Sequence, residues 1–192
     1  MNRDAFFATV RANPFGGALT RGQVDGLNAL LDAFGKITPP LDPRWQAYML
    51  GTTFHETART MQPIEEIGKG RGRAYGHRAG PWHQVYDGRG DVQLTWQQNY
   101  VHATQRLRAL GMIGSDVDLA RNPDLALRPE IAAAIMIHGM QEGWFTGRKL
   151  SDYFGDRVTD WIGARRVING LDCAAKIAGY ARAFLAALSA AA

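Results

Sequence analysis

A glycine-rich segment over residues 68–91 interrupts a sequence whose apolar residues otherwise recur at helical spacing. Frequent glycines and few helix-forming residues predict loops in this segment and helices before and after it. Within it, residues 84–86 and 91–94 flank a turn at residues 87–90, which is the pattern of a small β-hairpin. The expected fold is therefore mainly α (α+β): a helical domain with a small hairpin lobe inserted between its helices.

The helices are expected from the apolar spacing and from start signals. Apolar residues within positions 24–34 follow Thr20, a candidate N-cap. The next helix is expected from about Asp42 to Thr60, and Pro129 suits the first turn of a later one. Further helices are expected over residues 96–110, 129–141 and 158–167, and from residue 171 to the alanine-rich end.

With 192 residues and an apolar fraction of 46%, the chain suits one domain over residues 1–192. The net charge of +4 fits anionic partners, but the basic residues are scattered apart from residues 69–73, which disfavours nucleic-acid binding. The one cysteine, Cys173, excludes an intrachain disulfide and is expected to be buried near the start of the last helix. Without a signal-peptide pattern or an apolar stretch of spanning length, we expect a chain made in the cytoplasm and not stably inserted in a membrane.

Glu56 is the first candidate catalytic residue. It follows Trp45, Met49 and Thr52 on one helix face, at the end of a largely apolar stripe. Desolvation there favours a protonated carboxyl, which is the form that a general acid requires. A buried glutamate paired with Arg59 or with a backbone amide explains the same pattern equally well.

A zinc site is not favoured by the histidine pattern. His55 and Glu56 match the start of a zinc-protease motif, but Arg59 stands where the second histidine is required. The remaining histidines show no ligand spacing, so we expect neither a metal nor a cofactor.

Polar side chains are expected beside the turn at residues 87–90. Gln93 and Thr95 alternate along the expected strand, and Thr95 and Asn99 are four residues apart at the strand-to-helix junction. Their amide and hydroxyl groups can bond sugar hydroxyls, an N-acetyl group or a water. Thr95 is also a candidate N-cap of the following helix. The turn lacks the lysine of a phosphate-binding loop, so nucleotide binding is not expected.

In this order and combination, the motifs resemble the family 19 glycoside hydrolases, which comprise plant-type chitinases and related endolysins of the lysozyme superfamily. The matching segments are residues 55–57, 88–95, 99–100, 122–125 and 167–170. The opening, residues 15–27, is similar to the endolysin branch more than to the plant enzymes. The resemblance implies a lysozyme-like fold with a cleft between the helical domain and the hairpin lobe. Within residues 1–192 we expect a single catalytic domain and no separate wall-binding module.

The resemblance further implies how the catalytic work is divided. Glu56 is the implied general acid, and Thr95 holds the attacking water. Glu65 matches the base best by spacing, with Glu66 as a close rival. The reaction of the family inverts the anomeric carbon, which requires two carboxyls about 6.5–9.5 Å apart. The candidate substrate-binding residues are His55, Glu66, Tyr86, Gln93, Asn99, Tyr100 and Asn169. Asp91 stands where plant enzymes carry a proline and is expected to place a negative charge beside the site.

We therefore expect a glycosidase that cleaves the β-1,4 links of peptidoglycan after release to the wall by a holin or another export route. A chitinase acting on N-acetylglucosamine polymers is the nearest alternative, because the two glycans share that sugar. A non-catalytic wall-binding domain is the third. The expected partner is the glycan itself, and the expected enzyme is a monomer that binds no nucleic acid.

Overall fold

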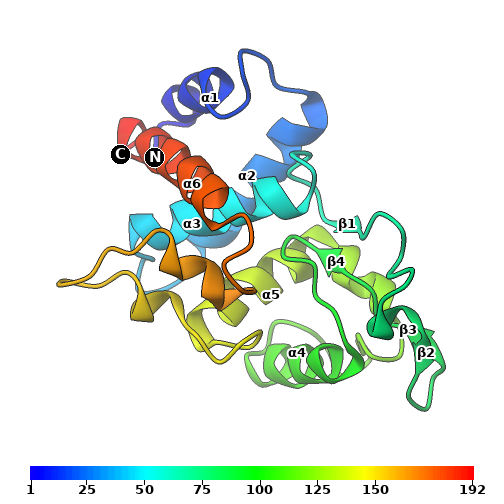
Figure 1. The fold of residues 1–192 in the computed structure, drawn as a ribbon. Helices are drawn as coiled ribbons and strands as arrows, with labels where there is room; N and C mark the ends of the chain where they lie inside the picture. Colours follow the sequence, from blue (N-terminus) through cyan, green and yellow to red (C-terminus); the bar gives the residue numbers. More distant parts are fainter.

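The computed structural model describes residues 1–192 and confirms a mainly α fold with a small β lobe (Figure 1). The helices are α1 (Arg3–Ala12), α2 (Arg21–Gly35), α3 (Pro43–Glu56), α4 (Gln97–Ala109), α5 (Pro129–Glu142) and α6 (Ala174–Ala190). The strands are β1 (Ile64–Glu65), β2 (Arg78–Ala79), β3 (Gln84–Val85) and β4 (Arg89–Gly90). Shorter 3₁₀ helices cover Ala74–Gly76, Pro123–Leu127, Leu150–Asp152 and Gly163–Val167.

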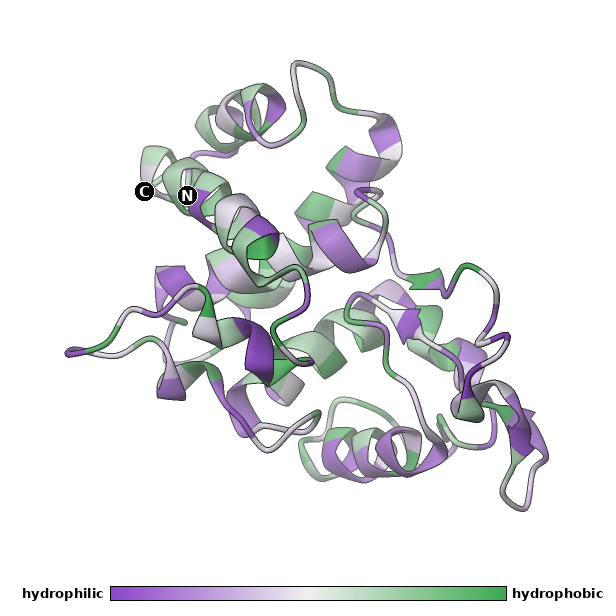
Figure 2. Cartoon of the chain, in the orientation of Figure 1, coloured by the Kyte–Doolittle hydropathy of each residue, from purple (hydrophilic) through white to green (hydrophobic).

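α3 and α6 pack against each other at the centre of the helical domain. Gly51 permits their close crossing, since a Cβ there would lie 2.7 Å from the backbone nitrogen of Ala181. α1, which the sequence spacing does not predict, packs on α6, and α5 packs on α2 and α3. One cluster of 41 buried apolar residues runs through these helices. Figure 2 shows apolar residues along α5 and α6, and hydrophilic ones on α4 and around β2 and β3. This core fixes the end of α3 in space.

The helix starts expected from the sequence are confirmed. Thr20 caps α2 in a capping box with Gln23. The side chain of Asp42 caps α3 by accepting from the backbone nitrogen of Arg44. Pro129 occupies the first turn of α5. Each of these signals involves only residues near the start of its helix, so it can be recognised without knowing the rest of the fold.

α3 ends earlier than its apolar pattern predicts. It stops at Glu56 instead of near residue 60, because Ala58 and Arg59 have φ values of 50° and 67°, in the left-handed region. Glu56 is therefore the last residue of the helix.

The hairpin expected across residues 87–90 is wrong. β3 pairs with β2, and β4 pairs with β1 from the other side of the glycine-rich loop. Residues 91–94 do not form a strand, because Gln93 has a φ of 55° and only Leu94 makes a single bridge, to Arg89. The β lobe therefore consists of two short two-stranded sheets.

Two expectations near the C-terminal end are also wrong. The helix expected over residues 158–167 is shorter: a β-bridge between Phe154 and Thr159 takes its start, and only the 3₁₀ helix Gly163–Val167 forms. Cys173 is exposed and lies just before α6, as its N-cap residue, with a φ of 54°. None of the helices combines the length and the apolar character needed to cross a membrane.

Candidate active site

Fourteen residues from the helical domain and the β lobe line a cleft of about 480 Å³. They are Glu56, Glu66, Tyr75, Gly88, Val92, Gln93, Leu94, Thr95, Trp96, Asn99, Phe145, Thr146, Ile168 and Asn169. The cleft lies where the end of α3, the β lobe, the start of α4 and the loops after α5 and after Gly163–Val167 meet. Six of the ten candidate residues from the sequence are thereby brought together.

Glu56 presents its carboxylate to the cleft while its helix face lies in the core. Met49 and Thr52 on that face are fully buried, as the apolar stripe predicts. The Glu56 side chain is 16% exposed, and its Oε1 accepts a hydrogen bond of 2.6 Å from Nη1 of Arg165, which is 4% exposed. Arg59, the structural partner considered from the sequence, lies instead over a phenylalanine ring.

Sequence reasoning missed Arg165, which bonds Glu56, and Tyr75, which lines the cleft and bonds Glu66. Arg165 belongs to the 3₁₀ helix Gly163–Val167, 109 residues after Glu56, and its Nε also donates to the backbone oxygen of Asp172 at 3.1 Å. No spacing rule connects residues so far apart. Because this ion pair is almost buried and hydrogen-bonded, it holds the Glu56 carboxylate in one orientation.

Glu65 and Glu66 point in different directions, as neighbouring residues of an extended strand do. Glu66 lines the cleft, where its Oε1 accepts from the Tyr75 hydroxyl and its Oε2 from the backbone nitrogen of Gly88, both at 3.1 Å. Glu65 does not line the cleft, because its carboxylate pairs with Arg89 at 3.0 Å and with Lys69 at 2.7 Å. Of the two rivals, Glu66 is thus the one that shares the cleft with Glu56.

The arginine of the Gly88-Arg89-Gly90 motif is a buried structural residue. Its guanidinium contacts the carboxylates of Glu65 at 3.0 Å, Asp87 at 2.7 Å and Asp124 at 3.1 Å. The contact with Asp87 is an ion pair without hydrogen-bond geometry. Burial raises the pKa of Asp87, and the charge of Arg89 partly opposes that rise. Arg89 therefore stabilises the turn at residues 87–90, in which the backbone nitrogen of Gly88 donates to Glu66.

Gln93 packs directly against Gly88, where a Cβ would lie 2.8 Å from the Gln93 side-chain oxygen. The Gln93 amide donates to the backbone oxygens of Ile64 at 3.0 Å and Gly90 at 3.2 Å. These bonds hold the Gln93 side chain in place in the wall of the cleft. A side chain at position 88 would push Gln93 away from this place.

The Thr95 hydroxyl is not used as a helix cap. α4 begins at Gln97 with Trp96 as its N-cap residue, and that end has no side-chain cap. The Asn99 amide donates to the backbone oxygen of Thr95 at 2.9 Å, which ties the two residues together at the cleft wall. Thr95 lines the cleft, and its hydroxyl makes no hydrogen bond to the protein.

Four candidate residues lie outside the cleft. Tyr86 and Tyr100 are buried, and their hydroxyls donate to the backbone oxygens of Ala120 at 2.8 Å and Asp87 at 2.7 Å. Burial raises the pKa of both tyrosines. His55 does not line the cleft, and burial lowers its pKa. Glu65, paired with Arg89, is the fourth. The two tyrosines are therefore structural, contrary to the sequence expectation of substrate binding.

No three His, Cys, Asp or Glu side chains are placed to hold a metal ion together. The ionisable side chains that line the cleft are the two glutamates and Tyr75. The arrangement can therefore supply a proton donor and a proton acceptor, with amide and hydroxyl groups between them.

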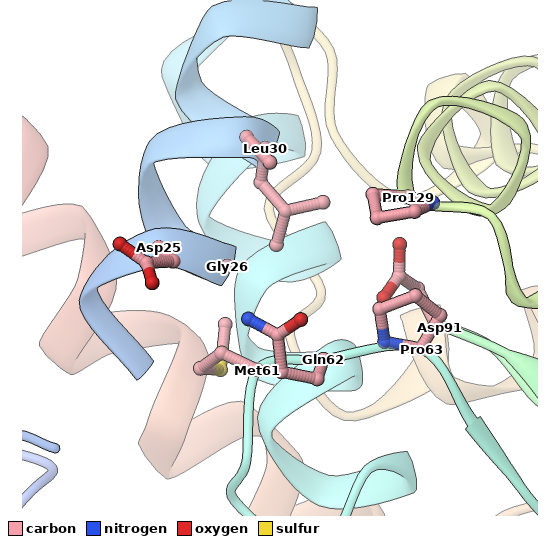
Figure 3. Close-up of a pocket in the computed structure, with 9 residues that line it drawn as sticks. Asp25, Gly26, Leu30, Met61, Gln62, Pro63, Asp91 and Pro129 are labelled. Carbon is pink, nitrogen blue, oxygen red and sulfur yellow. The ribbon is translucent and has the colours of Figure 1, made fainter. Parts of the chain in front are cut away.

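Asp91 does not add charge to the cleft, contrary to expectation. It is 2% exposed and faces a separate cavity of about 120 Å³ that Leu30, Gln62 and Pro129 also line (Figure 3). In Figure 3 its carboxyl points towards Pro129, while Asp25 at the far side of the cavity points away from it. Its Oδ1 has no hydrogen-bond partner. Burial raises the pKa of Asp91 to about 7.

Asp91 is therefore expected to make stability fall as the pH rises. Between pH 3.8 and about 7 the unfolded chain loses the proton of Asp91 while the folded chain keeps it. This difference lowers the free energy of unfolding by at most about 4 kcal/mol across that window. We expect Asp91→Asn to match the wild type at pH 4 and to be the more stable protein at pH 8. Chemical unfolding of both proteins at the two pH values measures the difference; parallel pH profiles would contradict it.

Solved structures of chitinases share this fold. A single-substitution mutant of a chitinase C is 23% identical with a TM-score of 0.56, over 99% of this chain and 91% of its own. Chitinase C from Streptomyces griseus HUT6037 is 21% identical with a TM-score of 0.57, over 95% and 75% of the two chains. A bacterial family 19 chitinase is 24% identical with a TM-score of 0.51, over 96% and 93%. No family model matches the chain, and no curated protein matches it.

The likeness establishes the architecture of the chain. It has the lysozyme-like, mainly α fold of the family 19 chitinases, and the match extends over nearly the whole sequence. At identities below a quarter, fold and function are separate questions, so the chemistry has to be argued from the cleft.

Proposed function

We propose that the chain is an inverting glycoside hydrolase that cleaves β-1,4 links in an N-acetylglucosamine-containing glycan, with peptidoglycan as its substrate. The observation that carries the proposal is the shared cleft of Glu56 and Glu66, with Thr95 in the same wall. Inverting glycosidases use two carboxyl groups in one cleft, one as the general acid and the other as the general base. The fold shared with family 19 chitinases supports the same reaction class.

In this proposal the two glutamates act in one step. Glu56 gives its proton to the glycosidic oxygen while the bond from that oxygen to the anomeric carbon breaks. Water attacks the anomeric carbon from the opposite face and gives a proton to Glu66. Arg165 then stabilises the carboxylate that Glu56 becomes, at 2.6 Å. The Thr95 hydroxyl orients the water, and the Tyr75 hydroxyl holds Glu66.

We assign the base to Glu66 rather than to Glu65. A base must reach the attacking water directly or through one intervening water. Glu66 lines the cleft, whereas the Glu65 carboxylate is occupied by Arg89 and Lys69. The short spacing that favoured Glu65 is thus outweighed by the direction in which each side chain points.

A basic loop beside the cleft favours peptidoglycan over chitin. Lys69, Arg71 and Arg73 are exposed in the segment between Glu66 and Tyr75, both of which line the cleft. Arg71 and Arg73 form no ion pair with the protein. Peptidoglycan carries carboxylates on its lactyl and peptide groups, whereas chitin is uncharged. Complementary charge therefore favours the anionic polymer.

Product analysis tests the proposal. We expect purified protein to release new reducing ends from murein, with masses that correspond to cleavage between sugars. Nuclear magnetic resonance should show the α-anomer first, because inversion of a β link produces it. Raising the salt from about 50 to 300 mM should slow murein cleavage, since screening weakens contacts with the basic loop, and should leave chitin-hexamer cleavage nearly unchanged.

Each alternative has a distinct result in the same assay. Cleavage of chitin oligomers without cleavage of murein would identify a chitinase. Sedimentation with murein without new reducing ends would identify a non-catalytic wall-binding domain. A first product in the β-anomer would overturn inversion and with it the assignment of Glu66 as a base for water.

A further inference from the structure

The cavity beside Asp91 contains a buried carboxyl that the proposed reaction does not use. This cavity of about 120 Å³ lies between α2, the residues before β1 and the start of α5 (Figure 3). Asp91 is 2% exposed, and its Oδ1 accepts no hydrogen bond from the protein. A buried carboxylate without a partner is costly, so a group that pairs with it is bound favourably.

The side chains around the cavity offer hydrogen-bond acceptors and no donor. The one amide among them, Gln62, donates from its nitrogen to the backbone oxygen of Gly22, and its oxygen lies on the side of Asp91 (Figure 3). Pro63 and Pro129 lack even a backbone N–H. The cavity is therefore complementary to a ligand that donates hydrogen bonds. Its lining residues are Asp25, Gly26, Ala29, Leu30, Met61, Gln62, Pro63, Asp91 and Pro129.

The charges around the cavity favour a cation. Two of the nine lining residues are acidic and none is basic. Asp25 is exposed at the rim, points away from the cavity and lies 3.8 Å from Arg21 (Figure 3). Glu130, at the start of α5, is exposed and pairs with Arg128 at 2.6 Å. Burial alone raises the pKa of Asp91, with no neighbouring positive charge to lower it, so the protein supplies Asp91 with no counter-charge.

An ammonium group suits the cavity better than a divalent metal ion. Calcium takes about six to eight oxygen ligands, and magnesium about six. The side chains that face the cavity provide only the oxygens of Asp91 and Gln62, whereas an ammonium group has three or four N–H bonds to donate. Ala29, Leu30 and Pro63 supply an apolar wall for an alkyl stem. The volume equals that of about four water molecules, so the stem has to be short.

We propose that the cavity binds a small primary ammonium ion, with the Asp91 carboxylate and the Gln62 oxygen accepting its N–H bonds. The apolar wall covers its alkyl stem. Gln93, two residues after Asp91, lines the catalytic cleft instead, so the two sites lie on different sides of one segment. The inference does not rest on the proposed function, because Glu56 and Glu66 take no part in it. A ligand that binds only the folded chain stabilises it.

Thermal unfolding at pH 8 tests the proposal, with methylammonium chloride as the probe. We expect about 100 mM methylammonium to raise the melting temperature by about 3 °C or more. Equal concentrations of tetramethylammonium, which has no N–H, and of sodium should shift it by less than about 1 °C, since they match only the ionic strength. Asp91→Asn should lose the methylammonium shift, because the amide carries no charge. Asp25→Asn is the matched control and should keep it, because that carboxylate points away from the cavity.

Calorimetric titration with methylammonium measures binding directly in the same proteins. Binding to the wild type and to Asp25→Asn, with none to Asp91→Asn, would support the proposal. Gln62→Leu, which removes one of the two acceptors, should weaken binding about tenfold. An absent methylammonium shift, an equal shift with sodium or tetramethylammonium, or a shift that Asp91→Asn retains would overturn the proposal. Neither measurement involves glycan cleavage, so failure of the proposed function would leave this result unchanged.

Discussion

Replacing Glu56 with glutamine is expected to lower the rate of glycan cleavage about a thousandfold, the scale associated with loss of a general acid. Glutamine keeps an oxygen that can accept the hydrogen bond from Arg165, but it has no acidic proton to transfer. The variant should therefore bind murein as the wild type does and release almost no reducing ends. Reducing-end release and sedimentation with murein measure the two properties on the same preparation.

The Glu56→Gln variant needs a stability control. It removes the charge partner of Arg165, which is only 4% exposed, so its melting temperature has to be compared with that of the wild type. Glu130→Gln is the matched substitution, because Glu130 lies in an exposed ion pair with Arg128. Undiminished cleavage by a folded Glu56→Gln protein would exclude Glu56 as the acid. Loss of cleavage in Glu130→Gln as well would show that the assay reports stability.

The helices were predictable from the sequence where their signals are local. Thr20 and Asp42 cap their helices through residues two or three positions away, so a short window contains the whole interaction. The β lobe lacks that property. β1 pairs with β4 across the glycine-rich loop, and the φ of 55° at Gln93 breaks the alternation from which a strand was expected. Pairing between distant segments leaves no periodic trace in either of them.

The sequence predicts which residue types form the site better than it predicts where each side chain lies in space. Glu56 and Thr95 reach one cleft, as the motifs predict. Tyr100 belongs to the same motif but points inward to the Asp87 backbone, because a helix face decides which residues reach the cleft. Arg165 was out of reach of sequence reasoning, since its partner lies 109 residues away.

The same substitution at Glu65 and at Glu66 is expected to give opposite results. Glu66→Gln should lower cleavage about a hundredfold or more, because the amide cannot take the proton of the attacking water. Its carboxylate lies in the cleft between the Tyr75 hydroxyl and the Gly88 backbone nitrogen. The oxygen of the glutamine amide can still accept one of these two hydrogen bonds, so the fold should persist.

Glu65→Gln should instead keep cleavage within about threefold of the wild type, since its carboxylate lies outside the cleft. It should lower the free energy of unfolding by about 1–2 kcal/mol, because Arg89, only 7% exposed, loses one carboxylate and retains Asp87 and Asp124. Cleavage rates and urea unfolding of the two variants separate the roles. An inactive Glu65→Gln beside an active Glu66→Gln would move the base to Glu65. That result would require the ion pair with Arg89 to open when glycan binds, because a paired carboxylate facing away from the cleft cannot reach the water.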